Sequence, residues 1–400
     1  MTSASRLPAA AGGTFSDPSP LGIYIHVPFC GRKCPYCDFY STTDFSRLDP
    51  FREALTREIH RRAQPGRLVD TIYFGGGTPS AVPAALITGT LAALHTAFAV
   101  NPRAEITVEV NPESASPEKL AAYRRAGINR LSIGAQSFSD ANLRLLGRRH
   151  SAADAAAACE NARAAGFENL SLDLIYGIPG QDEAGWRDDL EAAVALAPQH
   201  LSCYTLTFEP HTVFHQQAAK RRIHPLPEGK VHDLFLLTGD FLAVHGYLRY
   251  EVSNFARRDP YDGRPAISRH NSRYWTFAPY LGFGPAAHSF IGSTRSWNVR
   301  SVRRYCEKIA VDGTAVAGRE ELSAAQQMTE ALYLGLRTSA GIDIAAFNRR
   351  FDVNFAALFG EKIGLFEKKG LMAVDSGACR LTRQGMPVLD AVVGELVLNY

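Results

Sequence analysis

Apolar and polar positions alternate in blocks along the chain from residue 21 onward. Six short runs are rich in β-branched or aromatic residues and are apolar continuously rather than at every second position. Such runs are typical of strands that are buried on both faces of a parallel sheet. The six predicted strands span residues 22–27, 71–74, 106–110, 130–133, 170–174 and 201–207.

Helical periodicity fills the intervals between these runs. Residues 49–62 carry apolar side chains at four-residue spacing, as in an amphipathic helix. Residues 116–126 begin with a serine cap and a proline, and residues 152–165 end at Gly166, a residue that stops helices. Strand and helix units repeated about six times predict an α/β fold. The expected architecture is a partial (β/α)6 barrel, with an open doubly wound sheet as the alternative, because a closed barrel of this kind has eight units.

The pattern also predicts a division into segments. Residues 1–20 are rich in Ala, Ser, Gly and Pro, do not read as a signal peptide, and are expected to form a flexible tail. Residues 21–215 are the expected barrel core, and 216–315 are a barrel extension and connecting segment. Residues 316–400 predict a smaller, mainly helical domain with a short hairpin, which is winged-helix-like.

Composition excludes several classes of protein. Hydrophobic residues make up 46% of the 400 residues and charged residues 21%, which is ordinary for a globular chain. Lys and Arg total 43 against 40 Asp and Glu, so no dedicated nucleic-acid binder is expected. No apolar run approaches the roughly 18 to 20 residues of a membrane span. The cytoplasm is the expected compartment.

Three of the seven cysteines are close together, directly after the first predicted strand. Cys30, Cys34 and Cys37 have the spacing C-x3-C-x2-C, whereas the other four are scattered singly. Thiolates are soft ligands that select zinc, copper(I) or iron–sulfur clusters. A structural zinc site needs a fourth ligand, for which His26 is a candidate. The spacing favours an iron–sulfur cluster, and zinc or three metal-free thiols are the alternatives.

Glycines and polar residues follow the other predicted strands, at the ends where active sites of such folds lie. Three glycines at 75–77 let the backbone approach a ligand closely. Glu109 could pair with an ammonium group, and Gln136 and Arg148 could bind a carboxylate or ribose. Asp173 stands inside an apolar strand, so it needs either a ligand or an internal partner.

The cysteine motif, with Tyr36 before its last cysteine, resembles that of the radical S-adenosylmethionine (SAM) superfamily. The resemblance implies a [4Fe-4S] cluster on Cys30, Cys34 and Cys37, whose fourth iron chelates SAM. One electron from the cluster would then split the sulfonium and release a 5′-deoxyadenosyl radical, so the hard chemistry belongs to the cofactor. Tyr24, Gly76 and Glu109 match the superfamily's SAM site. A second SAM site of one branch is matched by Tyr36, Gly77, Thr78, Gln136, Arg148 and Asp173.

Longer matches narrow the resemblance to the oxygen-independent coproporphyrinogen III oxidase-like group. They lie at residues 73–80, 131–138, 173–180 and 250–256. The group contains a dehydrogenase, which decarboxylates coproporphyrinogen III oxidatively, and haem chaperones of the HemW type. The dehydrogenase pattern has a fourth cysteine where this chain has Phe39. The chaperone pattern H-N-x-x-Y-W stands intact from His270 to Trp275, which favours the chaperone and keeps the dehydrogenase as the alternative.

Haem binding is the main expectation from that motif. Imidazole is a common axial ligand of haem iron, so His270 is the expected ligand and His288 is its rival. Aromatic residues beside the motif could cover the macrocycle, and Arg269 and Arg273 could pair with propionates. A buried histidine that only supports its loop is the plainer reading. The expected partners are haem and an acceptor protein of unknown identity, and a dimer is possible.

Overall fold

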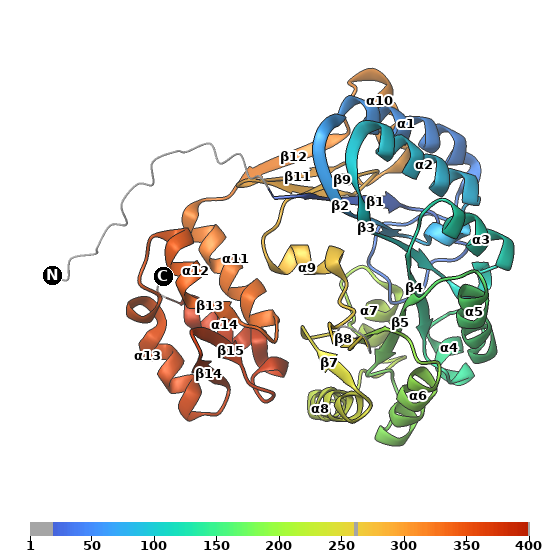
Figure 1. Ribbon diagram of the computed structural model, residues 1–400. Coiled ribbons are helices and arrows are strands. Elements are labelled where there is room, and N and C mark those ends of the chain that lie inside the picture. The colour runs from blue at the N-terminus through green and yellow to red at the C-terminus, as the bar shows by residue number, and fades with distance from the viewer. Residues whose placement is uncertain (1–18, 260–262, 399–400) are drawn as a thin grey trace.

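The computed structural model describes residues 19–259 and 263–398, and its main feature is a large curved sheet (Figure 1). The sheet has 12 strands in the order β12-β11-β10-β9-β1-β2-β3-β4-β5-β6-β8-β7. The first six strands of the chain are parallel neighbours, and all six predicted strands are confirmed. They are β1 (Leu21–Val27), β2 (Gln64–Gly76), β3 (Phe98–Val110), β4 (Arg130–Gln136), β5 (Asn169–Tyr176) and β6 (His200–Thr205).

Helices between these strands cover the outer, convex face of the sheet (Figure 1). Local sequence explains where several of them begin. Ser116 accepts a hydrogen bond from the backbone of Lys119, and Ser151 and Asp154 form a reciprocal capping box. The helices between the strands are α1 (Leu48–Arg61), α2 (Ala84–Ala97), α3 (Pro117–Arg125), α4 (Asp140–Leu145), α5 (Ala152–Ala164) and α6 (Glu183–Ala195). Two more, α7 (Val213–Ala219) and α8 (Glu228–Val244), follow β6.

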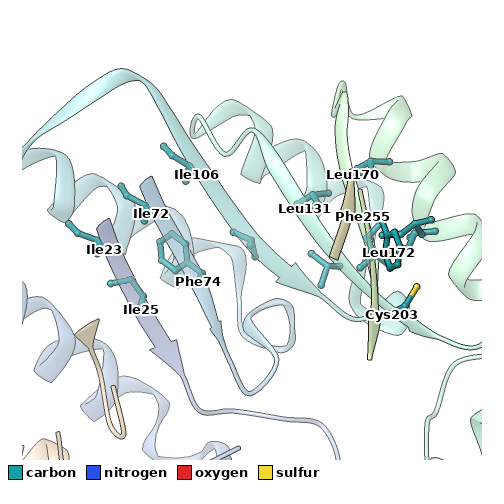
Figure 2. Close-up of a cluster of buried hydrophobic side chains, with 14 of the residues drawn as sticks. Ile23, Ile25, Ile72, Phe74, Ile106, Leu131, Leu170, Leu172, Cys203 and Phe255 are labelled. Carbon is teal, nitrogen blue, oxygen red and sulfur yellow. The ribbon is translucent and has the colours of Figure 1, made fainter. Parts of the chain in front are cut away.

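The two faces of the parallel strands differ in chemistry, which the continuous apolar runs did not predict. Outward-facing side chains such as Ile23, Phe74, Leu131 and Cys203 form the hydrophobic core under the helices (Figure 2). The alternate residues face inward and are largely polar. They include Tyr24, Tyr73, Glu109, Ser132, Asp173 and Ser202. The parallel strands therefore alternate with a period of two residues. Apolar side chains face the helices, and polar side chains face the inside of the barrel.

Additional strands extend the sheet at both edges. At one edge, β8 (Asn254–Arg257) pairs with β6 and with β7 (Tyr247–Arg249). At the other edge, β9 (Tyr280–Phe283) runs parallel to β1, and the antiparallel strands β10 (His288–Ile291), β11 (Thr294–Asn298) and β12 (Val316–Glu321) follow. Two helices, α9 (Arg269–Trp275) and α10 (Val302–Val311), interrupt this part of the chain. The domain boundaries expected at 215 and 315 stay predictions.

The C-terminal region is mainly helical and carries a small separate sheet. Its helices are α11 (Ala324–Arg337), α12 (Ile344–Phe351), α13 (Phe355–Lys368) and α14 (Leu389–Val397). The strands β14 (Met372–Asp375) and β15 (Ala378–Leu381) form the expected hairpin, and β13 (Ile342–Asp343) joins it. No helix within the described residues has the length and apolar character to cross a bilayer. The predicted flexible tail falls, up to residue 18, outside the described residues.

Candidate functional site at the rim of the barrel

The cysteine motif forms a loop at the carboxyl end of β1. Its base is closed by two backbone hydrogen bonds, from Cys30 N to Thr42 O (2.9 Å) and from Thr42 N to Pro28 O (2.7 Å). Cys30 is buried, Cys34 and Cys37 are partly exposed, and none of the three forms a disulfide. Burial, followed by the neighbouring thiols, raises the pKa of Cys37 to about 11. The fold thus holds three thiols next to one another on one loop.

His26, near the carboxyl end of β1, supports this loop. Its Nε2 lies 2.9 Å from the carbonyl oxygen of Tyr40, and its Nδ1 lies 3.2 Å from the hydroxyl of Tyr24. Burial lowers the pKa of His26 to about 4, so the ring is neutral at pH 7. Both ring nitrogens are engaged inside the protein. His26 therefore has no nitrogen left to complete a zinc site with the cysteines in this arrangement.

A chain of side-chain hydrogen bonds ties the cysteine loop to the ends of three strands. Thr78 Oγ1 donates to Cys30 Sγ (3.5 Å), and Asn111 Nδ2 donates to Thr78 Oγ1 (3.4 Å). Arg148 bridges from Asn111 Oδ1 (2.8 Å) back to the loop at Cys34 Sγ (3.6 Å). Donors of this kind stabilise a sulfur that carries negative charge. This chain fixes two of the three thiols relative to β2, β3 and β4.

The glycines that end β2 leave no space for side chains. At Gly76, whose φ is +107°, a Cβ would lie 2.5 Å from the ring of His26. At Gly77 it would lie 2.8 Å from the backbone of Pro28, to whose neighbour Val27 the Gly77 amide donates (2.9 Å). Only glycine fits at both positions. The two glycines therefore let the end of β2 pack directly against His26 and the start of the cysteine loop.

Two partly buried carboxyl groups face inward from neighbouring parts of the wall. Glu109 accepts from the hydroxyl of Tyr73 (2.9 Å) and from the amide of Gly76 (3.2 Å). Burial, together with Asp173 nearby, raises the pKa of Glu109 to about 7. Burial also raises the pKa of Asp173, which accepts from Ser132 at 3.1 and 3.2 Å. A cationic group placed here would recover the energy that burial of these carboxylates costs.

The remaining predicted rim residues lie at the same end of the strands. Gln136 ends β4 in a left-handed backbone conformation, with φ of 66°. Its amide nitrogen lies near Gly134, which also accepts a hydrogen bond from Arg148. Tyr36 packs against Phe214 of α7, with ring centroids 6.2 Å apart. Tyr24 stands lower on the inner wall, stacked on Tyr73 at 6.3 Å.

The donor set suits a cluster that takes one thiolate on each of three iron atoms. Across 19–259 and 263–398, no three Cys, His, Asp or Glu side chains converge on a point where a single ion could sit. The three thiols instead share one loop, which lies beside the backbone of Gly76 and the carboxylate of Glu109. Iron–sulfur clusters bind through separate cysteine thiolates. The three cysteines of this loop are therefore the residues that would hold such a cluster.

The H-N-x-x-Y-W motif forms α9, which lies between the sheet and the C-terminal helices (Figure 1). His270 is almost completely buried, and both of its ring nitrogens are engaged. Nδ1 lies 2.9 Å from Thr71 Oγ1, and Nε2 lies 3.0 Å from the hydroxyl of Tyr274. The ring also stacks on Tyr73 at 5.2 Å. Burial lowers the pKa of His270 to about 3, so it stays neutral.

The other motif residues join α9 to both parts of the molecule. Arg273 is buried and forms an ion pair with Asp70, and Arg269 lies 3.6 Å from the same carboxylate. On the opposite side, the ring of Trp275 lies 4.5 Å from the guanidinium carbon of Arg337 at the end of α11. The motif thus connects the sheet to the C-terminal helices, and we call α9 with these contacts the α9 joint. Its two arginines already pair with the carboxylate of Asp70.

Comparisons with known proteins show the family to which the chain belongs. Residues 24–193 match the radical SAM superfamily, and residues 322–388 match the HemN C-terminal domain. A Bacillus subtilis protein named heme chaperone HemW is 35% identical over 93% of this chain and 99% of its own length. The chain belongs to the HemW family. Another HemW relative, from Synechocystis, is 36% identical over 81% of this chain and 79% of its own length.

A solved structure extends the comparison beyond the HemW family. It is coproporphyrinogen III oxidase (HemN) from Escherichia coli, described as a radical SAM enzyme, with a TM-score of 0.81 and 28% identity. The match covers 95% of this chain and 90% of the solved one. The α/β barrel and the helical C-terminal region are therefore both shared with that protein. Phe39, at the position of the expected fourth cysteine of the dehydrogenase pattern, is 70% exposed.

Sequence reasoning missed three residues that organise the site of this HemW family member. Asn111 connects Thr78 to Arg148, and its place between a strand end and a proline was the available signal. Tyr73 holds Glu109 and stacks on His270, and the two-residue period of β2 would have placed it on the inner wall. Thr71, the partner of His270, carried no signal in the sequence, because 199 residues separate the two.

Proposed function

We propose that this protein is a haem chaperone, which binds haem and passes it to an acceptor protein. The observation that carries the proposal is full-length similarity to proteins named heme chaperone HemW, at 35% identity over 99% of one such relative. The H-N-x-x-Y-W motif and the absence of a cysteine at Phe39 support the same branch. The identity of the acceptor is open. Seven cysteines without a disulfide support work in the cytoplasm.

The proposed cofactor is a [4Fe-4S] cluster on Cys30, Cys34 and Cys37, with exchangeable SAM. When bound, the pair would supply electron transfer to the sulfonium of SAM. Gly76 and Glu109 would receive the amino-acid part of SAM, with Tyr24 on the wall beneath them. A second nucleoside would contact the remaining predicted residues, which are Tyr36, Gly77, Thr78, Gln136, Arg148 and Asp173.

A direct experiment separates this function from oxidative decarboxylation. The protein is reconstituted with its cluster without oxygen and given coproporphyrinogen III, SAM and a reductant. We expect no protoporphyrinogen IX, together with measurable binding of ferric haem and its loss to a haem-free acceptor such as apomyoglobin. Sustained formation of protoporphyrinogen IX would instead make the protein a dehydrogenase, the activity in the name of the HemN structure it resembles.

A further inference from the structure

His288 differs from His270 in that its ring is open. It lies on β10 and is exposed, and neither ring nitrogen has a hydrogen-bond partner among the described residues. His270, by contrast, uses both nitrogens inside the protein. An axial ligand needs a free lone pair on a neutral imidazole. Burial, with Arg295 and Arg300 nearby, lowers the pKa of His288, which keeps its ring neutral at pH 7.

Strand pairing places His288 on the inner face of the barrel. Tyr280 lies beside Gly22 of β1 and opposite Phe290 of β10, so these side chains share the inward-facing side. His288 is two residues from Phe290 and therefore points the same way. It also lies close enough to His26 to contribute to the lowered pKa of that ring.

A flat aromatic surface lies beside the open imidazole. Trp297 of β11 is the cross-strand partner of His288, and the two rings are 6.1 Å apart and nearly parallel, at 29°. The indole lies across Gly318 of β12, where a Cβ would clash with it. The ring is therefore held flat against the sheet. Because an axial imidazole stands perpendicular to the plane of a haem, the stacked indole fixes the orientation of the His288 ring and leaves its edge free to meet the iron.

The same face continues into an apolar cavity of about 400 Å³ between the barrel and the C-terminal helices. Phe290 and Arg295, on the strands of His288 and Trp297, line it. Tyr274 and Phe277 line it from the motif segment. Arg295 is committed to Glu330 at 2.6 Å. Arg300, which follows β11, is exposed and has no ion pair within the described part of the chain.

We propose that haem binds against the inner face of β10 and β11, with a ring nitrogen of His288 as an axial ligand. Trp297 packs against the face of the His288 ring and sets its orientation, the apolar edge of the haem enters the cavity beside Phe290, and Arg300 faces a propionate. One dative bond forms from nitrogen to iron, and no electron is transferred. His270 then acts as a positioning residue, which holds α9 and with it Tyr274 at the wall of the cavity. The inference rests on the proposed function, since it assigns the place of its cargo.

The test compares full-length variants that carry the reconstituted cluster and are loaded with ferric haem. Electron paramagnetic resonance reports whether histidine still ligates the haem iron. We expect His288→Ala to lose the histidine-ligated signal and to bind haem about tenfold more weakly or worse. Added imidazole should restore the signal. His95→Ala, which removes an exposed histidine on α2, should match the wild type.

His270→Ala provides the decisive contrast. If it folds, it should keep the histidine-ligated signal, because His288 is intact. Loss of that signal in His270→Ala but not in His288→Ala would overturn the inference and leave the chaperone function standing. A wild-type protein that binds no haem would instead overturn the chaperone function itself. Arg300→Ala should weaken haem binding by about two- to fivefold, as expected for an exposed ion pair.

Discussion

The rim of the barrel and the α9 joint carry two strong sequence motifs, but they differ in what their polar groups can still bind. At the rim, the three thiols of the cysteine loop form no disulfide, and Cys34, Cys37 and Glu109 are partly exposed. At the joint, His270 and Arg273 are satisfied by partners inside the chain. A sequence motif can therefore mark residues that the fold itself needs. Only the motif groups that have no partner inside the protein are available to bind a ligand. Four predictions sharpen or break this contrast.

The largest effect should come from the cysteine loop. Replacing Cys30, Cys34 or Cys37 with serine should abolish nearly all bound iron and sulfide, because a hydroxyl is a poor ligand for iron in such clusters. Chemical assay of iron and sulfide after reconstitution measures this loss. Cys306→Ser is the matched control, since Cys306 is also partly exposed but lies far along the chain on α10. Equal iron content in all variants would remove the cluster from this loop.

A substitution in the α9 joint should lower the free energy of unfolding of the protein. His270→Ala removes two hydrogen bonds and a stacked ring from a buried position, so we expect unfolding to become easier by about 2–4 kcal/mol. His288→Ala, at an exposed ring without hydrogen bonds, should cost no more than about 0.5 kcal/mol. Denaturant unfolding of the haem-free proteins compares them. Equal losses at both positions would contradict the division into an enclosed and an open histidine.

Gly76, at the end of β2, should tolerate no side chain. Gly76→Ala places a Cβ against the ring of His26 and forces an unfavourable positive φ, which should cost about 1–3 kcal/mol. Gly89→Ala is its control, because Gly89 lies in the helix α2 with open space around it. That substitution should stabilise the protein by up to about 1 kcal/mol. Thermal unfolding of both variants shows the contrast, which a stable Gly76→Ala protein would refute.

Glu109 should give the smallest effect, visible as a pH dependence. Its pKa is about 7 in the folded protein against an ordinary 4.5, so the folded state holds a proton that the unfolded chain has released between these values. Stability from this group therefore falls as the pH rises from about 4.5 to about 7. Relative to Glu109→Gln, the wild type should lose about 1–2 kcal/mol over that range. A constant difference between the two melting profiles would show that Glu109 titrates normally.

Local pattern predicted the elements well, because it acts over short distances. The six parallel strands and the capped helix at Ser116 follow from composition and caps within a few residues. The cysteine loop was equally visible, since its three thiols lie within eight residues of sequence. The polar inner wall was not seen, because apolar runs hide the alternation of residues such as Tyr73 and Asp173. The occupied nitrogens of His270 depend on Thr71, which only the folded sheet brings near.

Among the residues that the structure describes, the open sheet ends in two edge strands, and both have features that disfavour self-association. β12 ends one edge with Arg319, Glu320 and Glu321 in sequence, and β7 ends the other with only three residues. Charged and very short edge strands resist pairing with a second chain. An unclosed barrel therefore keeps its mouth accessible without becoming a template for polymerisation. Both edge strands thus disfavour a dimer that forms by joining two sheets.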